Sequence, residues 1–234
     1  MEKLKLKYLS DLGYSIIPCN SDKTPIGSWK KYQTTARSKD EIESLNSPLY
    51  GLVTGYNNLE VLDIDLKVVT GTKDKIDLWD EFLKFIKDNI LDFDEKFVIV
   101  KTKNAGYHIL YKCNFIEGNK KIAKLKDTTE ALFETRGIGG MVIMYENFVS
   151  KLDSYSQIQE ITEEDRDILL TSARMYNYIE EVTIEPKKEK TEFSTGNVTP
   201  WQDYNEKTNI LDLVQSDFTI VANHNKRYVI KRHG

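Results

Sequence analysis

The stretch "NLEVLDIDLK", residues 58–67, carries two aspartates two positions apart in an otherwise apolar run. The apolar residues predict a buried strand, in which a carboxylate without a partner is costly. Side chains two apart on a strand share one face, so Asp63 and Asp65 are expected side by side, roughly 6–7 Å apart. Two such carboxylates repel unless a cation lies between them, and hard divalent cations such as Mg²⁺ bind oxygen ligands of this kind. The pair therefore predicts a metal site, with a solvent-facing pair on an edge strand as the alternative.

The segment "VKTKNAGYHIL", residues 100–110, runs from a strand through a polar turn into a second strand. The turn holds Lys103, Asn104 and Gly106, and the second strand carries His108. A lysine, a tight turn with free backbone N–H groups and a histidine together suit a polyphosphate. The alternative for a single histidine is a structural role.

The segment "ALFETRGIGGMVIMY", residues 131–145, places Glu134 inside an apolar strand and Arg136 two residues later. A third carboxylate with an adjacent fixed cation and a glycine-rich turn is unusual for a plain core. We therefore group Glu134 with the two aspartates as a candidate metal ligand. The alternative is a surface ion pair, which alone would contribute little to stability.

Lysines are concentrated in one part of a chain whose net charge is −4. Residues 96–126 hold eight lysines and one acidic residue, Glu117. A local positive surface beside an acidic site suits nucleic acid and a nucleoside triphosphate. A solvated lysine-rich face is the alternative.

The composition is that of a globular protein, with 234 residues of which 40% are hydrophobic and 30% charged. Its two cysteines, Cys19 and Cys113, form no CxxC motif, which argues against a disulfide framework and a structural zinc site. The N-terminus is too charged for a signal peptide, and no apolar run is long enough to span a bilayer. We therefore expect a cytoplasmic protein with no membrane partner.

Hydrophobic periodicity, caps and turn signals predict the elements of residues 1–178. Helices are expected over residues 3–12, 38–45, 74–90 and 162–176, the second opened by a capping box. Strands are expected over residues 14–19, 50–66, 96–102, 107–113, 131–137 and 140–146, with 50–66 forming two strands of a hairpin or close to one. This order predicts an α+β fold with a mainly antiparallel sheet flanked by helices.

The C-terminal part has a different composition. Residues 184–197 are polar and charged and predict a linker. Residues 199–216 predict a helix that begins at Thr199 and Pro200, and residues 218–232 predict a hairpin that turns at Asn223 to Asn225. This small unit ends at the last residue without a stopping signal, so we expect it to begin a further module of a longer, truncated protein.

Taken in order, these motifs resemble the primase-polymerase branch of the archaeo-eukaryotic primase superfamily, found in phage, plasmid and other mobile-element replication proteins. The resemblance covers residues 8–150. The matching residues are Gly13, Ile17, Pro18, Cys19, Lys23, Pro25, Trp29, Gly51 to Gly55, Asp63, Asp65, Gly106, Tyr107, His108, Glu134, Arg136, Gly139 and Gly140. The chain departs from the family in using a glutamate where the third acid is often an aspartate. It also has Tyr145-Glu146-Asn147 where the family usually has proline-proline-serine.

The resemblance implies a primase-like core with an RRM-like sheet, and a DNA primase or DNA polymerase activity. The implied catalytic residues are Asp63, Asp65, Glu134 and His108, of which the three acids would hold two Mg²⁺ or Mn²⁺ ions. The residues implied to bind nucleotide are Lys103, Asn104, His108 and Arg136, and those implied to bind template are Lys120, Lys121, Lys124 and Lys126. The implied partners are a single-stranded DNA template or primer-template, nucleoside triphosphates and a helicase, fused or in trans. For a phage-encoded protein the location would be the host cytoplasm.

With this resemblance, we expect a catalytic domain over residues 1–178, a linker over 179–198 and a small accessory segment over 199–234. Two other functions remain open. A metal-dependent nuclease can use the same carboxylates, although it has no need for a histidine and lysine that bind triphosphate. A non-catalytic nucleic-acid-binding replication module predicts loss of the three acids, and all three are present.

Overall fold

The computed structural model describes residues 2–178, 218–224 and 227–232. The chain divides into two compact units, Met1–Tyr178 and Ile179–Gly234. The helices are α1 (Lys3–Asp11), α2 (Lys39–Ser44), α3 (Thr72–Asn89), α4 (Phe93–Lys96) and α5 (Glu163–Arg174), with short 3₁₀ helices η1 (Lys30–Gln33), η2 (Tyr56–Asn58), η3 (Leu66–Val68) and η4 (Tyr155–Gln157). The strands are β1 (Ile16–Cys19), β2 (Leu49–Val53), β3 (Leu59–Ile64), β4 (Val98–Lys101), β5 (Tyr107–Lys112), β6 (Lys120–Ala123), β7 (Phe133–Arg136), β8 (Met141–Ile143), β9 (Phe218–His224) and β10 (Arg227–Arg232).

The main sheet of the first unit has five strands in the order β4-β5-β3-β7-β6, and every pairing is antiparallel. The strand with the two aspartates, β3, lies at its centre, between β5 and β7. This arrangement confirms the expected α+β class with an antiparallel sheet.

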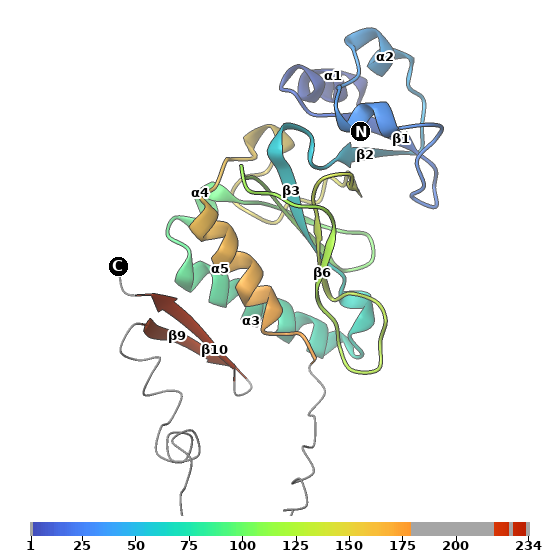
Figure 1. The fold of residues 1–234 in the computed structure, drawn as a ribbon. Coiled ribbons are helices and arrows are strands. Elements are labelled where there is room, and N and C mark those ends of the chain that lie inside the picture. Colours follow the sequence, from blue (N-terminus) through green and yellow to red (C-terminus); the bar gives the residue numbers. More distant parts are fainter. Residues whose placement is uncertain (1, 179–217, 225–226, 233–234) are drawn as a thin grey trace, which may run out of the picture. The chain divides into compact units, whose positions relative to one another are not determined.

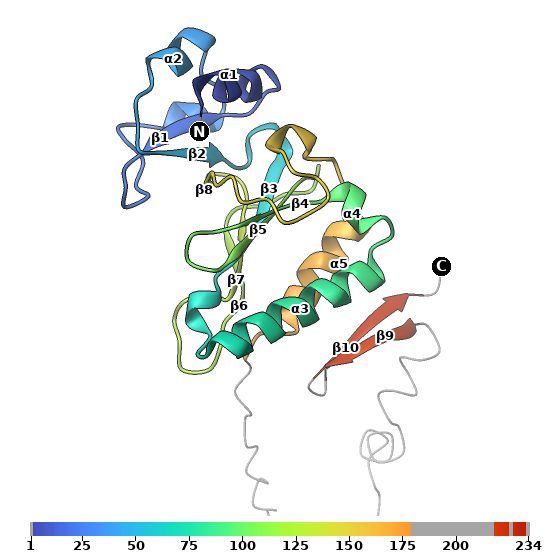
Figure 2. The ribbon, with the colours of Figure 1, turned by 180° about the vertical axis from the view of Figure 1, so that it is seen from behind.

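The two faces of this sheet are covered differently. Figures 1 and 2 show α3 and α5 side by side over one face. On that face, Leu62 and Ile64 of β3 belong to the same core cluster as Phe82 of α3 and Leu169 of α5. On the other face, Val61 packs in a second cluster with residues of α1, β1, β2 and β8. The alternating pattern of the β3 sequence therefore supplies both cores.

A second, smaller sheet has the order β1-β2-β8. The expected hairpin over residues 50–66 is therefore wrong, because β2 pairs with β1 and β8 and not with β3. The link between β2 and β3 redirects the chain with three residues in left-handed backbone, Gly55, Asn57 and Asn58. At Gly55 a side chain would collide with the backbone of Ile138, since a Cβ there would lie 2.4 Å from its Cα. The link thus carries the chain from one sheet to the other.

The remaining local expectations have mixed outcomes. Ser38 and Glu41 form the expected capping box of α2, and Thr162 caps α5. Strand β6 and helix α4 were not expected. Strands β9 and β10 pair as expected for a hairpin, but Asn223 and His224, which were expected in the turn, belong to β9 and pair with β10. The expected linker and the expected helix over residues 199–216 lie outside the described residues. Within the described residues, no helix combines the length and apolar character needed to cross a bilayer.

A buried ion pair connects the sheet to α5. Glu60 of β3 is fully buried and points to the helix-covered face, where Arg166 donates to it at 2.6 and 3.0 Å. The Tyr111 hydroxyl donates to the same carboxylate at 2.8 Å. Burial and the Glu60 carboxylate raise the pKa of Tyr111 well above its ordinary value, so its hydroxyl remains a donor. The carboxylate is therefore fully partnered in the core, as a buried charge must be.

We expect Arg166→Met to lower the free energy of unfolding by about 3 kcal/mol, because it leaves a buried carboxylate without its cation. Urea unfolding followed by circular dichroism measures the loss. The double variant Glu60→Gln/Arg166→Met should recover part of it, since no charge then remains in the core. As the control, Lys84→Met breaks an exposed pair with Asp88 and should cost less than about 0.5 kcal/mol. Equal stability of the Arg166→Met and Lys84→Met variants would contradict this account.

Candidate active site

Asp63 is the centre of a row of polar side chains that crosses three adjacent strands. Its partner across β5 is His108, and its partner across β7 is Glu134. Residues opposite each other in antiparallel strands point to the same face. The three side chains therefore lie together on the face that α3 and α5 do not cover.

Asp65 comes one residue after the end of β3 and is not part of the strand. Its backbone N–H donates to the carbonyl of Leu132 at 2.9 Å, which holds this stretch beside the residues that precede β7. Its carboxylate accepts a hydrogen bond from the backbone N–H of Lys67 at 3.2 Å and pairs with the Lys67 ammonium at 2.9 Å. Asp63 and Asp65 line the same cleft, as the spacing of the two residues predicts.

The carboxylates of the row are neutralised by Arg136. Its guanidinium lies 3.4 Å from Asp63 Oδ2 and 2.9 Å from Glu134 Oε2. The Glu134–Arg136 pair considered from the sequence therefore exists, but the arginine also contacts Asp63. The pair is thus part of an acidic cluster, which consists of Asp63, Asp65 and Glu134. Lys67 neutralises Asp65 in the same way, and its ammonium also pairs with the Glu130 carboxylate at 3.2 Å. Its hydrogen bonds to Asp65 and then to Glu130 raise the pKa of Lys67, so it is charged at neutral pH.

His108 is buried, and its Nε2 lies 3.6 Å from Asp63 Oδ1. Burial lowers the pKa of His108 below its ordinary value of 6.5; Asp63 opposes this shift, whereas Arg136 and Lys23 add to it. The imidazole is therefore neutral near pH 7 and can offer one N–H donor without a charge. The centre of the His108 ring lies 5.8 Å from that of the Tyr145 ring.

Two clefts meet at the carboxylates. The larger has a volume of about 410 Å³ and includes His108. The smaller has a volume of about 230 Å³ and includes Glu134. The residues that line both are Asp63, Asp65, Lys67 and Arg136. The same charged side chains thus line two neighbouring clefts, an arrangement that suits a site with two ligands.

The turn before β5 is only partly as expected. Asn104 lines the larger cleft together with Thr102, whereas Lys103 is exposed and does not line it. The backbone N–H of Gly106 is not free, because it donates to Thr102 Oγ1 at 3.1 Å. Only glycine fits here, since a Cβ would lie 2.2 Å from the carbonyl oxygen of Ile64. The turn therefore packs directly against the end of β3.

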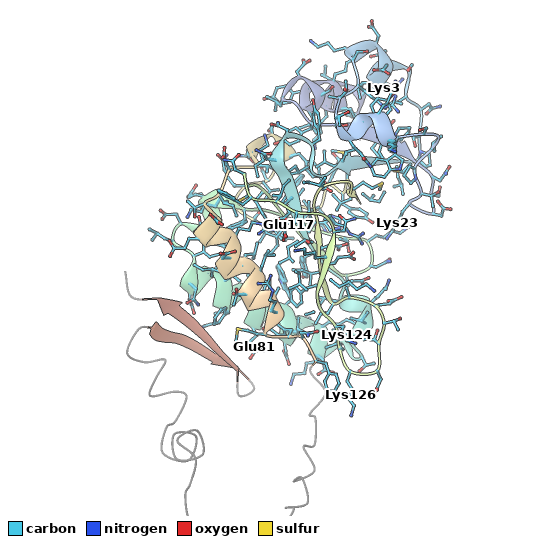
Figure 3. All side chains as sticks on the ribbon, viewed as in Figure 1. Lys3, Lys23, Glu81, Glu117, Lys124 and Lys126 are labelled. Atoms are coloured by element: carbon cyan, nitrogen blue, oxygen red, sulfur yellow. The ribbon has the colours of Figure 1, made fainter. Side chains whose placement is uncertain are left out.

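The lysines expected to bind template lie on and after β6, at the edge of the sheet. All four are exposed: Lys120, Lys121, Lys124 and Lys126. Lys121 lines the smaller cleft and donates to the carbonyl of Thr129 at 2.8 Å. Figure 3 shows Lys124 and Lys126 near each other, beyond the end of β6. The lysines thus extend from the smaller cleft along one side of the unit.

Several residues of the larger cleft were not expected at the site from sequence, among them Lys23, Lys67 and Tyr145. Lys23 belongs to a turn that matches the family pattern, but the pattern assigns it no role. Lys67 follows Asp65 by only two residues, so the local sequence could have indicated that it lies near the acids. Tyr145 stands where the family usually has proline. From the sequence it was therefore a difference from the family and not an expected site residue.

The donor set fits a divalent cation in its chemistry. Asp63, Asp65 and Glu134 are three carboxylates at the same clefts, with side chains that are 23, 33 and 21% exposed. Oxygen ligands of this kind are those of Mg²⁺ and Mn²⁺. In the part of the chain that the structure describes, no three acidic, histidine or cysteine side chains are already arranged around one point as metal ligands. Arg136 and Lys67 provide the positive charge instead.

Comparison with known protein families gives one match. The model of the family described as "Bifunctional DNA primase/polymerase, N-terminal" matches residues 5–165. The match includes both sheets of the first unit and every residue of the acidic cluster. No curated protein matches the sequence.

We expect Arg136→Gln to lower the free energy of unfolding by roughly 1 kcal/mol in the presence of EDTA, because two carboxylates then face each other without a cation. Millimolar Mg²⁺ should raise the melting temperature of this variant more than that of the native protein. Thermal melts with EDTA and with Mg²⁺ measure both effects. Lys84→Gln, which removes an exposed ion pair, is the matched control. Its melting temperature should respond to Mg²⁺ as that of the native protein does. The same Mg²⁺ response in all three proteins would refute a cation site at these acids.

Proposed function

Because this chain belongs to the bifunctional DNA primase/polymerase family, we propose that it catalyses template-directed transfer of nucleotides to a 3′-hydroxyl. The observation that carries the proposal is the row of Asp63, His108 and Glu134 at the junction of two clefts. The row combines ligands for divalent cations with a neutral hydrogen-bond donor. Such a site can hold a primer end and a triphosphate next to each other.

Asp63, Asp65 and Glu134 would hold two Mg²⁺ or Mn²⁺ ions, which when bound neutralise the triphosphate and lower the pKa of the attacking hydroxyl. Arg136 would release one or both carboxylates and turn its guanidinium towards phosphate oxygens, which it can bind in a bidentate manner. Such an exchange is feasible because the Arg136 pairs are partly exposed.

The remaining residues of the chain would orient the substrates. His108 would donate its N–H to a phosphate oxygen, and its neutral state allows it to lie beside Arg136 without repulsion. Asn104, which lines the cleft, and Lys103, on the exposed turn, would bind the outer phosphates. The lysines of β6 and the following loop would lie along the template phosphates.

The reaction balances as a phosphoryl transfer. The 3′-hydroxyl oxygen of the primer, or of an initiating nucleotide, bonds to the α-phosphorus of the incoming nucleotide. The bond from this phosphorus to the bridging oxygen breaks, and pyrophosphate leaves with the electron pair. The hydroxyl proton passes to solvent. The contribution of the protein is alignment and charge compensation.

We further propose that the catalytic domain is residues 1–178 and that it serves replication of a mobile element, with a helicase fused or in trans. Residues 199–234 would then be an accessory segment joined by a linker. The family match ends at residue 165, within the first unit, which supports this division.

The first test replaces the acids one at a time. Asp63→Asn, Asp65→Asn and Glu134→Gln should each reduce nucleotide incorporation by at least about 100-fold, because each removes an anionic ligand. Incorporation of labelled nucleotides on single-stranded and primed templates, with Mg²⁺ or Mn²⁺, measures the loss. Asp88→Asn, an exposed acid of α3, is the control. Near-normal synthesis by any of the three site variants would remove that residue from the ligand set, and degradation of the template in place of synthesis would favour the nuclease alternative.

The second test concerns the domain division. A fragment of residues 1–178 should extend a primer at a rate within a few-fold of the whole chain, because the whole candidate site lies in it. De novo primer synthesis is more demanding, since no duplex helps to hold template and two nucleotides, and we expect it to fall in the fragment. Parallel assays of extension and primer synthesis compare the two proteins. Loss of extension by a folded fragment would refute the division, and equal primer synthesis would remove residues 179–234 from initiation.

A further inference from the structure

The turn between β1 and α2 reaches the active-site cleft from the N-terminal sheet. Lys23, Thr24 and Pro25 of this turn line the larger cleft together with Asp63 and His108. Figure 3 labels Lys23 where the N-terminal part of the unit approaches the strands of the main sheet. The turn therefore provides a wall of the cleft that belongs to neither the acidic cluster nor the strand with His108.

This turn has a defined conformation. The backbone N–H of Asn20 donates to the carbonyl of Thr24 at 2.8 Å, and that of Lys23 donates to the carbonyl of Asn20 at 2.9 Å. Asp22 accepts hydrogen bonds from the N–H and the hydroxyl of Thr24 at 3.0 and 2.6 Å. Cys19 and Pro25 pair as an isolated bridge, which fixes the base of the turn.

Lys23 itself has a left-handed backbone, with a φ of 73°. For a residue with a side chain this conformation costs on the order of 1 kcal/mol, and such strain is concentrated at functional sites. A glycine would adopt the same backbone without this cost. The presence of lysine is therefore explained better by its side chain than by the turn.

Charge compensation distinguishes Lys23 from the other cations of the cleft. Arg136 is paired with Asp63 and Glu134, and Lys67 is paired with Asp65 and Glu130. Across the described part of the chain, no carboxylate lies within ion-pair distance of the Lys23 ammonium. Lys23 can therefore accept an anion without breaking an internal ion pair.

We propose that Lys23 binds the phosphates of the incoming nucleotide, so that one triphosphate is held between the N-terminal sheet and the main sheet. This inference rests on the proposed function, because it assigns the larger cleft to the nucleotide. The ammonium acts as a point charge on a long, flexible side chain, which suits a polyphosphate whose position is set by other groups. The larger cleft would thus hold the nucleotide, whereas template phosphates would bind at the smaller cleft and along β6.

The test compares Lys23→Gln with Lys30→Gln in the full chain. Lys30 is an exposed lysine of the same N-terminal region and does not line the cleft. We expect Lys23→Gln to weaken binding of a non-hydrolysable nucleoside triphosphate by roughly ten-fold in calorimetric titrations, as expected for loss of one charge-assisted contact. In steady-state incorporation, KM for nucleotide should rise by a similar factor with kcat little changed. Lys23→Arg should restore most of the affinity, and binding of single-stranded DNA should be unaffected.

The possible outcomes separate this inference from the proposed function. Equal nucleotide affinity of the Lys23→Gln and Lys30→Gln variants would overturn the assignment of Lys23. A loss of DNA binding with unchanged nucleotide affinity would overturn it as well, since Lys23 would then bind template. If the native chain binds nucleotide but does not incorporate it, the proposed function fails while the titrations still decide the role of Lys23. Matched melting temperatures of both variants exclude unfolding as the cause.

Discussion

The register of β3 between β5 and β7 is the constraint on which the rest of the structure depends. A shift of one residue would turn every side chain of β3 to the opposite face. Asp63 would then enter the helix-covered core, and Leu62 would face the cleft. The register is held from both sides, because Leu62 and Ile64 pack under α3 and α5 while Val61 packs on the other face. The candidate site is thus placed by apolar packing and not by its own polar contacts.

The same strand carries two carboxylates, Glu60 and Asp63, that differ in burial. This difference gives Glu60 a structural role and leaves Asp63 accessible to ligands. Glu60 is enclosed with Arg166 and Tyr111, where a charge must keep its partners. Asp63 pairs with Arg136 at the edge of solvent, where ion pairs are weak and exchangeable. A ligand can therefore replace Arg136 at small cost, whereas no ligand can replace Arg166. Exchangeable compensation of this kind keeps an acidic site stable before its substrates bind.

Features determined by local sequence could be predicted, and features determined by pairing between distant segments could not. The capping box at Ser38 and the alternation in β3 need only neighbouring residues, and both agree with the structure. The partner of β2 depends on residues some ninety positions later in β8, so its proximity in sequence to β3 suggested a hairpin that does not exist. The acidic cluster could be grouped from its motifs, because Asp63 and Glu134 lie within apolar strands and Asp65 directly follows one. Lys23 matched the family pattern, but no role could be assigned to it, since its position at the cleft depends on how the two sheets meet.

The connection between β7 and β8 explains how the two sheets can form one cleft. It is short, and Thr54 holds both of its ends, donating to Gly137 at 2.7 Å and to Gly140 at 3.0 Å. Gly137 also allows close approach, since a Cβ there would lie 2.0 Å from the carbonyl oxygen of Glu117. Arg136 ends β7 on one side of this link, and Met141 begins β8 on the other. Both residues line the larger cleft, so the link fixes the part of the cleft that each sheet contributes. The N-terminal sheet is therefore as much a part of the site as the strands that carry the acids, which agrees with a family match that begins at residue 5.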